Sequence, residues 1–135
     1  MKQTDIIFIK AADNKTKVGR LCERIKAHFQ IGDRVLIMVP TQEAAGYIDD
    51  LLWRFPEDSF LPHRIISSPS NERLAITLGR ENLNKATVLF NLLPTAFPQF
   101  EQYATLYELY DETHPSKAEL SRQRLAAYPY HTLEG

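Results

Sequence analysis

The chain is poor in the residues and runs that several classes of protein require. It has one cysteine, Cys22, among 135 residues, which excludes an intramolecular disulfide and a thiolate zinc cluster. Its net charge is only −1, so no overall field draws it to nucleic acid or anionic lipid. No apolar run approaches the ~18 residues of a membrane-spanning helix, and residues 1–5 lack the apolar stretch of a secretory signal. We therefore predict a cytoplasmic protein without membrane attachment that does not bind DNA directly through bulk charge.

Glycine is missing where a nucleotide-binding chain needs it. A phosphate-binding loop requires glycines between the first strand and its helix, because backbone N–H groups must approach the phosphates closely. The corresponding residues, Lys10 to Thr16, contain none. Lys15-Thr16 matches only the end of a Walker motif, and without the glycines a solvated lysine before a helix cap is the better interpretation. No nucleotide cofactor is expected.

The polar residues form no catalytic or metal-binding pattern. The four histidines include no i, i+4 ligand pair and no HExxH motif. Asp58, Ser59 and His63 supply the residue types of a hydrolytic triad, but they share one proline-rich segment without a nucleophile elbow. The paired acids at 49–50 and 57–58 are typical of solvated carboxylates. The sequence predicts no catalytic residue, no metal site and no cofactor.

Alternating strand and helix patterns begin at the first residues. The apolar run at 5–9 predicts a buried strand, the stripe of apolar residues over 16–30 predicts a helix that stops at Gly32, and the apolar run at 34–39 predicts a second strand. Thr41 then caps a helix to about Arg54. The length suits one domain covering residues 1–135.

The rest of the chain continues the pattern less regularly. Residues 56–71 are rich in proline and serine and predict a surface connection, and strands are expected at 74–78, 86–90 and, as the last one, 104–110. Ser116 and Glu119 form a capping box that opens a closing helix to about Tyr128. The order predicts an α/β three-layer sandwich, with a mostly parallel, Rossmann-like sheet of helicase-like topology without a P-loop.

One aromatic residue breaks the helical pattern at 41–54. The expected core stripe comprises Ala44, Tyr47, Ile48, Leu51 and Leu52. On the same helical wheel Trp53 falls about 180° away from Ala44, on the face of Asp49 and Asp50. Two covers for the indole are compatible with this: the chain's own loop from Phe55 to Pro62, or a partner protein. Tryptophan is enriched in interface hot spots, so Trp53 with Phe60 is the candidate anchor.

The segment from Tyr47 to His63 carries a specific combination: Leu-Trp, then Pro, then Ser-Phe-x-Pro-His. With the strand at 34–37, Thr95 to Phe100, and the closing Ser121-Arg-Gln-Arg124 followed by Tyr128, it resembles the chi subunit family of bacterial DNA polymerase III. The resemblance covers nearly the whole chain, is most specific from 52 to 63 and is weakest from 67 to 84.

The resemblance implies a non-catalytic accessory subunit. Proteins of this family bridge the clamp-loader complex to single-stranded DNA-binding protein during DNA replication, with one surface holding the psi subunit and a distant one holding the acidic, Phe-ending tail of the DNA-binding protein. Trp53 and Phe60 match the family's docking aromatics for psi, with Pro56 and Pro62 shaping the loop.

The tail surface is implied for the closing helix. Arg122 matches a basic residue that pairs with carboxylates, and Arg124, Leu125 and Tyr128 complete the candidate set. The family shows an aromatic and a lysine where this chain has Leu125 and Ala126, and Arg124 points about 160° away from Arg122, so it cannot replace that lysine. The alternative is that both arginines are ordinary solvated helix charges.

Two other interpretations stay open. One is a small nucleotide-dependent enzyme or a degenerate helicase-like domain on the same sheet, which nucleotide titration would detect. The other keeps a binding function but gives the Trp53 surface to a helicase partner instead of psi.

Overall fold

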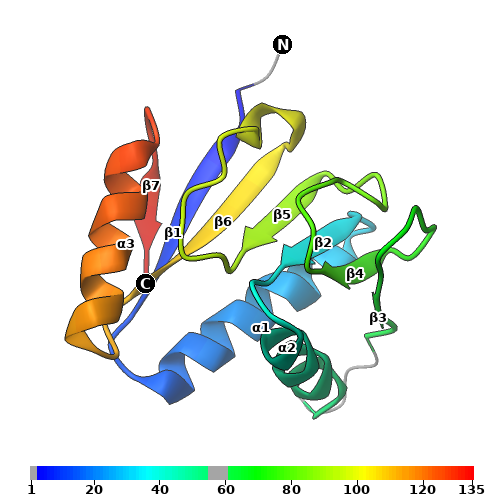
Figure 1. Ribbon diagram of the computed structural model, residues 1–135, viewed down its shortest axis with the longest axis horizontal. Helices are drawn as coiled ribbons and strands as arrows, with labels where there is room; N and C mark the ends of the chain where they lie inside the picture. Colours follow the sequence, from blue (N-terminus) through cyan, green and yellow to red (C-terminus); the bar gives the residue numbers. More distant parts are fainter. Residues whose placement is uncertain (1–2, 55–60) are drawn as a thin grey trace.

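Seven strands form one sheet in the order β3-β4-β2-β5-β6-β1-β7, and each neighbouring pair is parallel. The structure is a computed structural model that describes residues 3–54 and 61–135 (Figure 1). The elements are β1 (Asp5–Ala11), α1 (Asn14–Gln30), β2 (Val35–Met38), α2 (Gln42–Arg54), β3 (Arg64–Ile65), β4 (Leu74–Thr77), β5 (Val88–Asn91), the 3-10 turn η1 (Phe100–Gln102), β6 (Thr105–Asp111), α3 (Pro115–Ala127) and β7 (Thr132–Glu134).

Helices and loops cover both faces of the sheet. β2, β4 and β5 are buried along their whole length, as expected for parallel strands with layers on both sides. Within β2, Ile37 packs into the core under α1 and α2, whereas Leu36 and Met38 pack into the core that includes Tyr128 after α3. Figure 1 shows α1 and α2 on one side and α3 on the other. The predicted three-layer α/β fold is confirmed.

The helix boundaries follow from local capping. Asp13 caps α1, with its Oδ1 accepting a hydrogen bond from the Thr16 N–H at 2.8 Å, so the helix begins two residues before the predicted start. Thr41 Oγ1 accepts from the Ala44 N–H at 3.0 Å, which confirms the predicted cap of α2. Gly32 has a φ of +94°, the left-handed conformation that glycine adopts most readily, just beyond α1.

Two short edge strands were not predicted. The connection expected at 56–71 contains β3, and the strand predicted as the last one, β6, is followed by β7. β3 has only two residues, both exposed, and β7 has three, of which two are exposed. Such short exposed strands carry no alternation of apolar and polar residues, so the sequence gives no signal for them.

The predicted capping box at Ser116 is wrong. α3 begins at Pro115, and His114 is its cap, with Nδ1 accepting from the Ser116 N–H at 3.2 Å. Proline suits the first helical position because it has no N–H to satisfy, and this places the cap two residues earlier than predicted. Glu119 pairs with Arg122 instead of closing the box.

The core stripe of α2 is rotated from the predicted one. Tyr47, placed in the core by the wheel, is 51% exposed, whereas Ala45 is buried. The buried residues Ala45, Ile48, Leu51 and Leu52 are centred about 50° from Ala44 on the wheel, which leaves Tyr47 at the margin. Among the helices of the described residues, none is long and apolar enough to span a bilayer.

Candidate functional site

Trp53 lies near the end of α2 and is 53% exposed. Its neighbours Ile48, Leu51 and Leu52 are buried against the sheet. The predicted outward position of the indole is therefore confirmed. A half-exposed tryptophan leaves much apolar area at the surface, which is typical of a docking anchor.

His63 lies directly against this indole. The two ring centroids are 4.2 Å apart with a 39° tilt, and the His63 side chain is fully buried. Its Nδ1 is 2.6 Å from the Leu61 carbonyl oxygen, and its Nε2 is 3.0 Å from Asp49 Oδ1 and 3.2 Å from the Asp49 carbonyl oxygen. His63, which the sequence offered only as a triad residue and as part of the motif, thus joins residues 61–63 to α2.

The rim of the indole is acidic. Asp49 and Asp50 lie four and three residues before Trp53 and so share its helix face. Asp50 pairs with Arg54 at 2.7 Å, and both side chains are well exposed. Pro62 is exposed between buried Leu61 and His63. Phe60 and Pro56, the other predicted psi residues, lie outside the described residues.

Arg122 is on the outer face of α3 and is engaged by a neighbour. Its guanidinium donates a hydrogen bond to Glu119 one turn earlier, and more than half of each side chain is exposed. This hydrogen bond, and then the guanidinium charge, lower the pKa of the Glu119 carboxyl, and the same contact raises the pKa of Arg122. The guanidinium predicted to bind the tail is therefore already paired with a carboxylate of the same helix.

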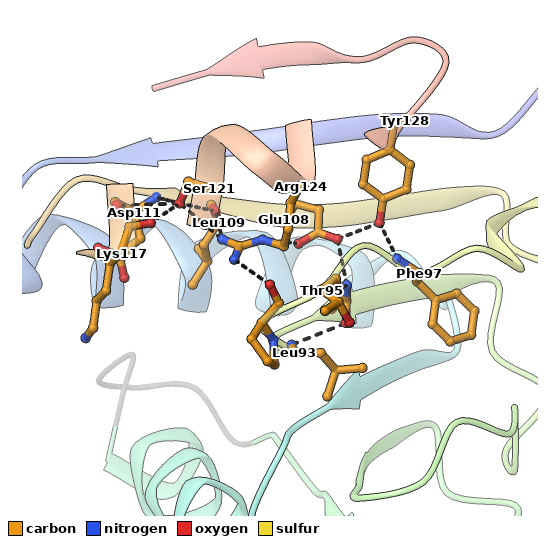
Figure 2. Close-up of polar contacts among 12 residues, drawn as sticks. Leu93, Thr95, Phe97, Glu108, Leu109, Asp111, Lys117, Ser121, Arg124 and Tyr128 are labelled. Carbon is orange, nitrogen blue, oxygen red and sulfur yellow. Dashed lines mark hydrogen bonds and ion pairs between the residues drawn. The ribbon is translucent and has the colours of Figure 1, made fainter. Parts of the chain in front are cut away.

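Arg124 points into the protein. Its guanidinium donates to the carbonyl oxygens of Leu109 at 2.7 Å and Pro94 at 3.3 Å, and to Ser121 Oγ at 3.1 Å (Figure 2). The residue is only 8% exposed, so the alternative of a solvated charge is wrong for Arg124. The opposite directions of Arg122 and Arg124 agree with the wheel.

The remaining two tail candidates also lie inward. Tyr128 is buried, and Leu125 is partly buried against the same core. The Tyr128 hydroxyl donates to Glu108 Oε2 at 2.5 Å and accepts from the Phe97 N–H at 2.9 Å. Of the four predicted tail residues, only Arg122 is exposed at the surface of α3.

A buried carboxyl group connects the polar side chains beneath α3. Glu108 on β6 accepts from Asn91 Nδ2 on the adjacent β5 at 2.6 Å and from Tyr128, and its Oε1 is 3.1 Å from Arg124 Nε. Burial raises the pKa of Glu108 to about 7, against the lowering effect of the hydrogen bonds from Tyr128 and Asn91 and of the charge on Arg124. The sequence analysis missed this cluster, although a glutamate inside the apolar run of β6 was a visible signal.

A groove runs along the carboxyl ends of the strands, where folds of this type bind nucleotides. Two adjoining pockets of about 400 and 450 Å³ share Pro40, Leu92, Leu109 and Lys117. At the start of α1, where a phosphate would bind, Asp13 accepts from both the N–H and the hydroxyl of Thr16. The protein's own carboxylate thus takes the anion position, which weighs against the nucleotide-dependent alternative.

The described residues also contain no group of three or more His, Cys, Asp or Glu side chains placed to hold a metal ion. Asp111 pairs with Lys17 in the groove at 3.0 Å, and both side chains are largely buried. Side-chain and backbone hydrogen bonds from Thr113, together with Lys17, lower the pKa of Asp111 against the effect of burial. This arrangement is typical of a structural ion pair.

Comparison with known proteins gives a consistent family. The family model of the DNA polymerase III chi subunit, HolC, matches residues 1–134. The DNA polymerase III subunit chi of Pseudomonas aeruginosa is 25% identical over 109 residues, covering 78% of this chain and 77% of the relative. The subunit of the same name from Escherichia coli K12 is 26% identical over 126 residues, covering 86% and 85%.

Proposed function

The chain belongs to the DNA polymerase III chi subunit family, and from that membership we propose that it is a non-catalytic accessory subunit of the clamp-loader complex. It works in the cytoplasm as a single domain. It bridges the psi subunit, with which it forms a heterodimer, to the C-terminal tail of single-stranded DNA-binding protein during DNA replication, and so contacts DNA only indirectly.

The observation that carries this proposal is the half-exposed Trp53, whose indole rests on the fully buried ring of His63. Interface hot spots are typically large aromatics that are already well packed on one side. The psi surface is formed by Trp53 and Pro62, together with Phe60 and Pro56 from the intervening segment. A helicase that uses the same anchor is the alternative occupant of this surface.

The tail surface is the outer face of α3. Arg122 supplies the cation for the carboxylates of the tail, whereas Arg124 and Tyr128 hold the helix on the sheet and Leu125 contributes apolar contact at its margin. A contact of this kind is electrostatic and exposed, so its affinity falls with rising salt. A salt-independent affinity for a peptide ending in acids and phenylalanine would remove this half of the proposal.

The psi surface is tested by a quantitative binding assay with the psi subunit of the same organism. We expect Trp53→Ala to weaken binding at least tenfold, as for a central aromatic anchor. Leu133→Ala is the matched control, because Leu133 is also an apolar residue about half exposed (50%), but on β7 at the far edge of the sheet from α2. If both variants bind psi like the parent chain, the assigned surface is incorrect.

A further inference from the structure

We propose that His63 is the positioning residue of the psi surface: it holds the Trp53 indole in its docking orientation before the partner arrives. This inference rests on the proposed function of that surface. It assigns no partner contact to His63, whose side chain is fully buried, and gives it instead an indirect role through the ring above it.

The imidazole is fixed at both of its nitrogen atoms. Nδ1 faces the Leu61 carbonyl oxygen at 2.6 Å, and Nε2 faces the Oδ1 and the carbonyl oxygen of Asp49 at 3.0 and 3.2 Å. Leu61 is itself buried in the core under α1 and α2. A ring with neighbours at both nitrogen atoms cannot change its side-chain rotamer without losing one of these contacts, so its plane is a fixed platform.

The platform limits the freedom of the indole. Trp53 belongs to the last turn of α2, and its side chain is about half exposed. With the centroids 4.2 Å apart and the planes tilted by 39°, one face of the indole is in contact with the imidazole. Ordering a side chain opposes binding, and a ring ordered beforehand avoids that cost on association.

A merely structural histidine would behave differently. If His63 served only to attach residues 61–63 to α2, its replacement would lower stability without changing the indole of the folded protein. A positioning role predicts instead a change in the mobility of one particular ring. The chain provides the probe, because Trp53 is its only tryptophan.

The experiment measures time-resolved fluorescence anisotropy of Trp53 in the full chain without partner, and then affinity for psi. The variants are His63→Asn, which keeps a donor near the Leu61 carbonyl but removes the stacked ring, and Asp49→Ala, which removes one support of the ring. Asp50→Ala is the matched control, because it makes the same change one residue away, where the carboxylate pairs with Arg54 and not with His63.

We expect faster local motion of the indole in the His63 and Asp49 variants and affinity for psi weakened roughly threefold to tenfold, the effect of losing one ordered side chain. The Asp50 variant should keep the parent mobility. If the His63 variant does not fold, the test rests on Asp49→Ala alone, because the backbone carbonyl of residue 49 still faces Nε2 and the substituted side chain is only partly buried.

Two results would overturn the inference while leaving the psi surface intact, provided that Trp53→Ala weakens psi binding. The first is that the folded His63 and Asp49 variants keep the indole mobility of the parent chain. The second is that their indole becomes more mobile but their affinity for psi does not change. A Trp53→Ala variant with full affinity gives a third, distinguishable result. It rejects the docking surface itself, and with it the role of His63, whatever the mobility of the ring.

Discussion

The guanidinium of Arg124 lies 3.1 Å from the carboxylate of Glu108, beneath α3. The contact is an ion pair without a hydrogen bond, since neither Arg124 Nε nor Glu108 Oε1 has a hydrogen-bond partner within the described part of the chain. Both groups are buried, and the other guanidinium nitrogens are bonded to the backbone and to Ser121. The pair therefore fixes which face of α3 is turned inward, and so which face presents Arg122.

The buried carboxyl makes stability depend on pH. The pKa of Glu108 is about 7 in the folded protein, above its ordinary value of 4.5, so the native state holds a proton that the unfolded chain releases. This contribution to stability is complete below about pH 4.5 and is lost as the pH rises through 7. Relative to Glu108→Gln, we expect the free energy of unfolding to fall by up to about 3 kcal/mol between pH 5 and pH 8.

Urea denaturation of both proteins at several pH values measures this difference. The pH-dependent part is diagnostic, because the cost of leaving Arg124 without a carboxylate in Glu108→Gln is constant over this range. Parallel pH profiles for the two proteins would show that Glu108 ionises as an ordinary glutamate.

Substitutions of the two arginines of α3 should affect different properties: that of Arg124 the stability of the fold, and that of Arg122 the binding of the tail peptide. Removing one partner of a buried ion pair typically costs about 3–5 kcal/mol, so at pH 8, where the Glu108 carboxyl is ionised, Arg124→Met should lower the free energy of unfolding by an amount in that range. Arg122→Ala should leave the unfolding midpoint unchanged but weaken binding of the acidic tail peptide, because Arg122 is exposed. Chemical denaturation and peptide titration, run on both variants, test this division. Equal destabilisation by the two variants would contradict it.

Helical periodicity predicted the directions of side chains relative to one another on the same helix. The wheel placed Trp53 outward and set Arg122 and Arg124 on opposite faces, and both results hold because one regular helix fixes relative angles. It failed for Tyr47, since the direction in which a helix faces its sheet depends on packing and not on the helix alone. The start of α3 failed for a local reason: Pro115 favours the first helical position and moves the cap to His114.

The contacts within the candidate site could be identified only from the structure. Glu108, Asn91 and Tyr128 meet only because β5 and β6 are neighbours and α3, which Tyr128 follows, packs on β6. His63 meets Trp53 because residues 61–63 return to α2, which sequence spacing does not reveal. Polar partners that are distant in the chain leave no periodic signal, even where each residue is conspicuous by itself.

The reactivity of the Cys22 thiol reports whether the folded protein opens around α1. The side chain is fully buried on α1, and burial raises the pKa of the thiol to about 11. At pH 8 only about one thiol in a thousand is then the reactive thiolate. We expect Ellman's reagent to label the native protein at a rate limited by unfolding, and to label it immediately in denaturing urea. Rapid labelling without denaturant would show that α1 opens locally.

The Arg122–Glu119 pair predicts a gain of function. Glu119 occupies the guanidinium that the proposed tail site requires, so the carboxylates of the tail must displace it. Exposed ion pairs are weak, and releasing one should raise affinity by only a small factor. We therefore expect Glu119→Gln to bind the acidic, Phe-ending peptide roughly threefold more tightly than the parent chain at low salt, with the advantage shrinking as salt increases. Glu112→Gln is the matched control, because it removes an equal charge from an exposed pair with Lys10 at 3.7 Å, outside α3 and not paired with Arg122. An equal gain in both variants would mean that net charge alone is responsible, and no gain in Glu119→Gln would mean that the tail does not use Arg122.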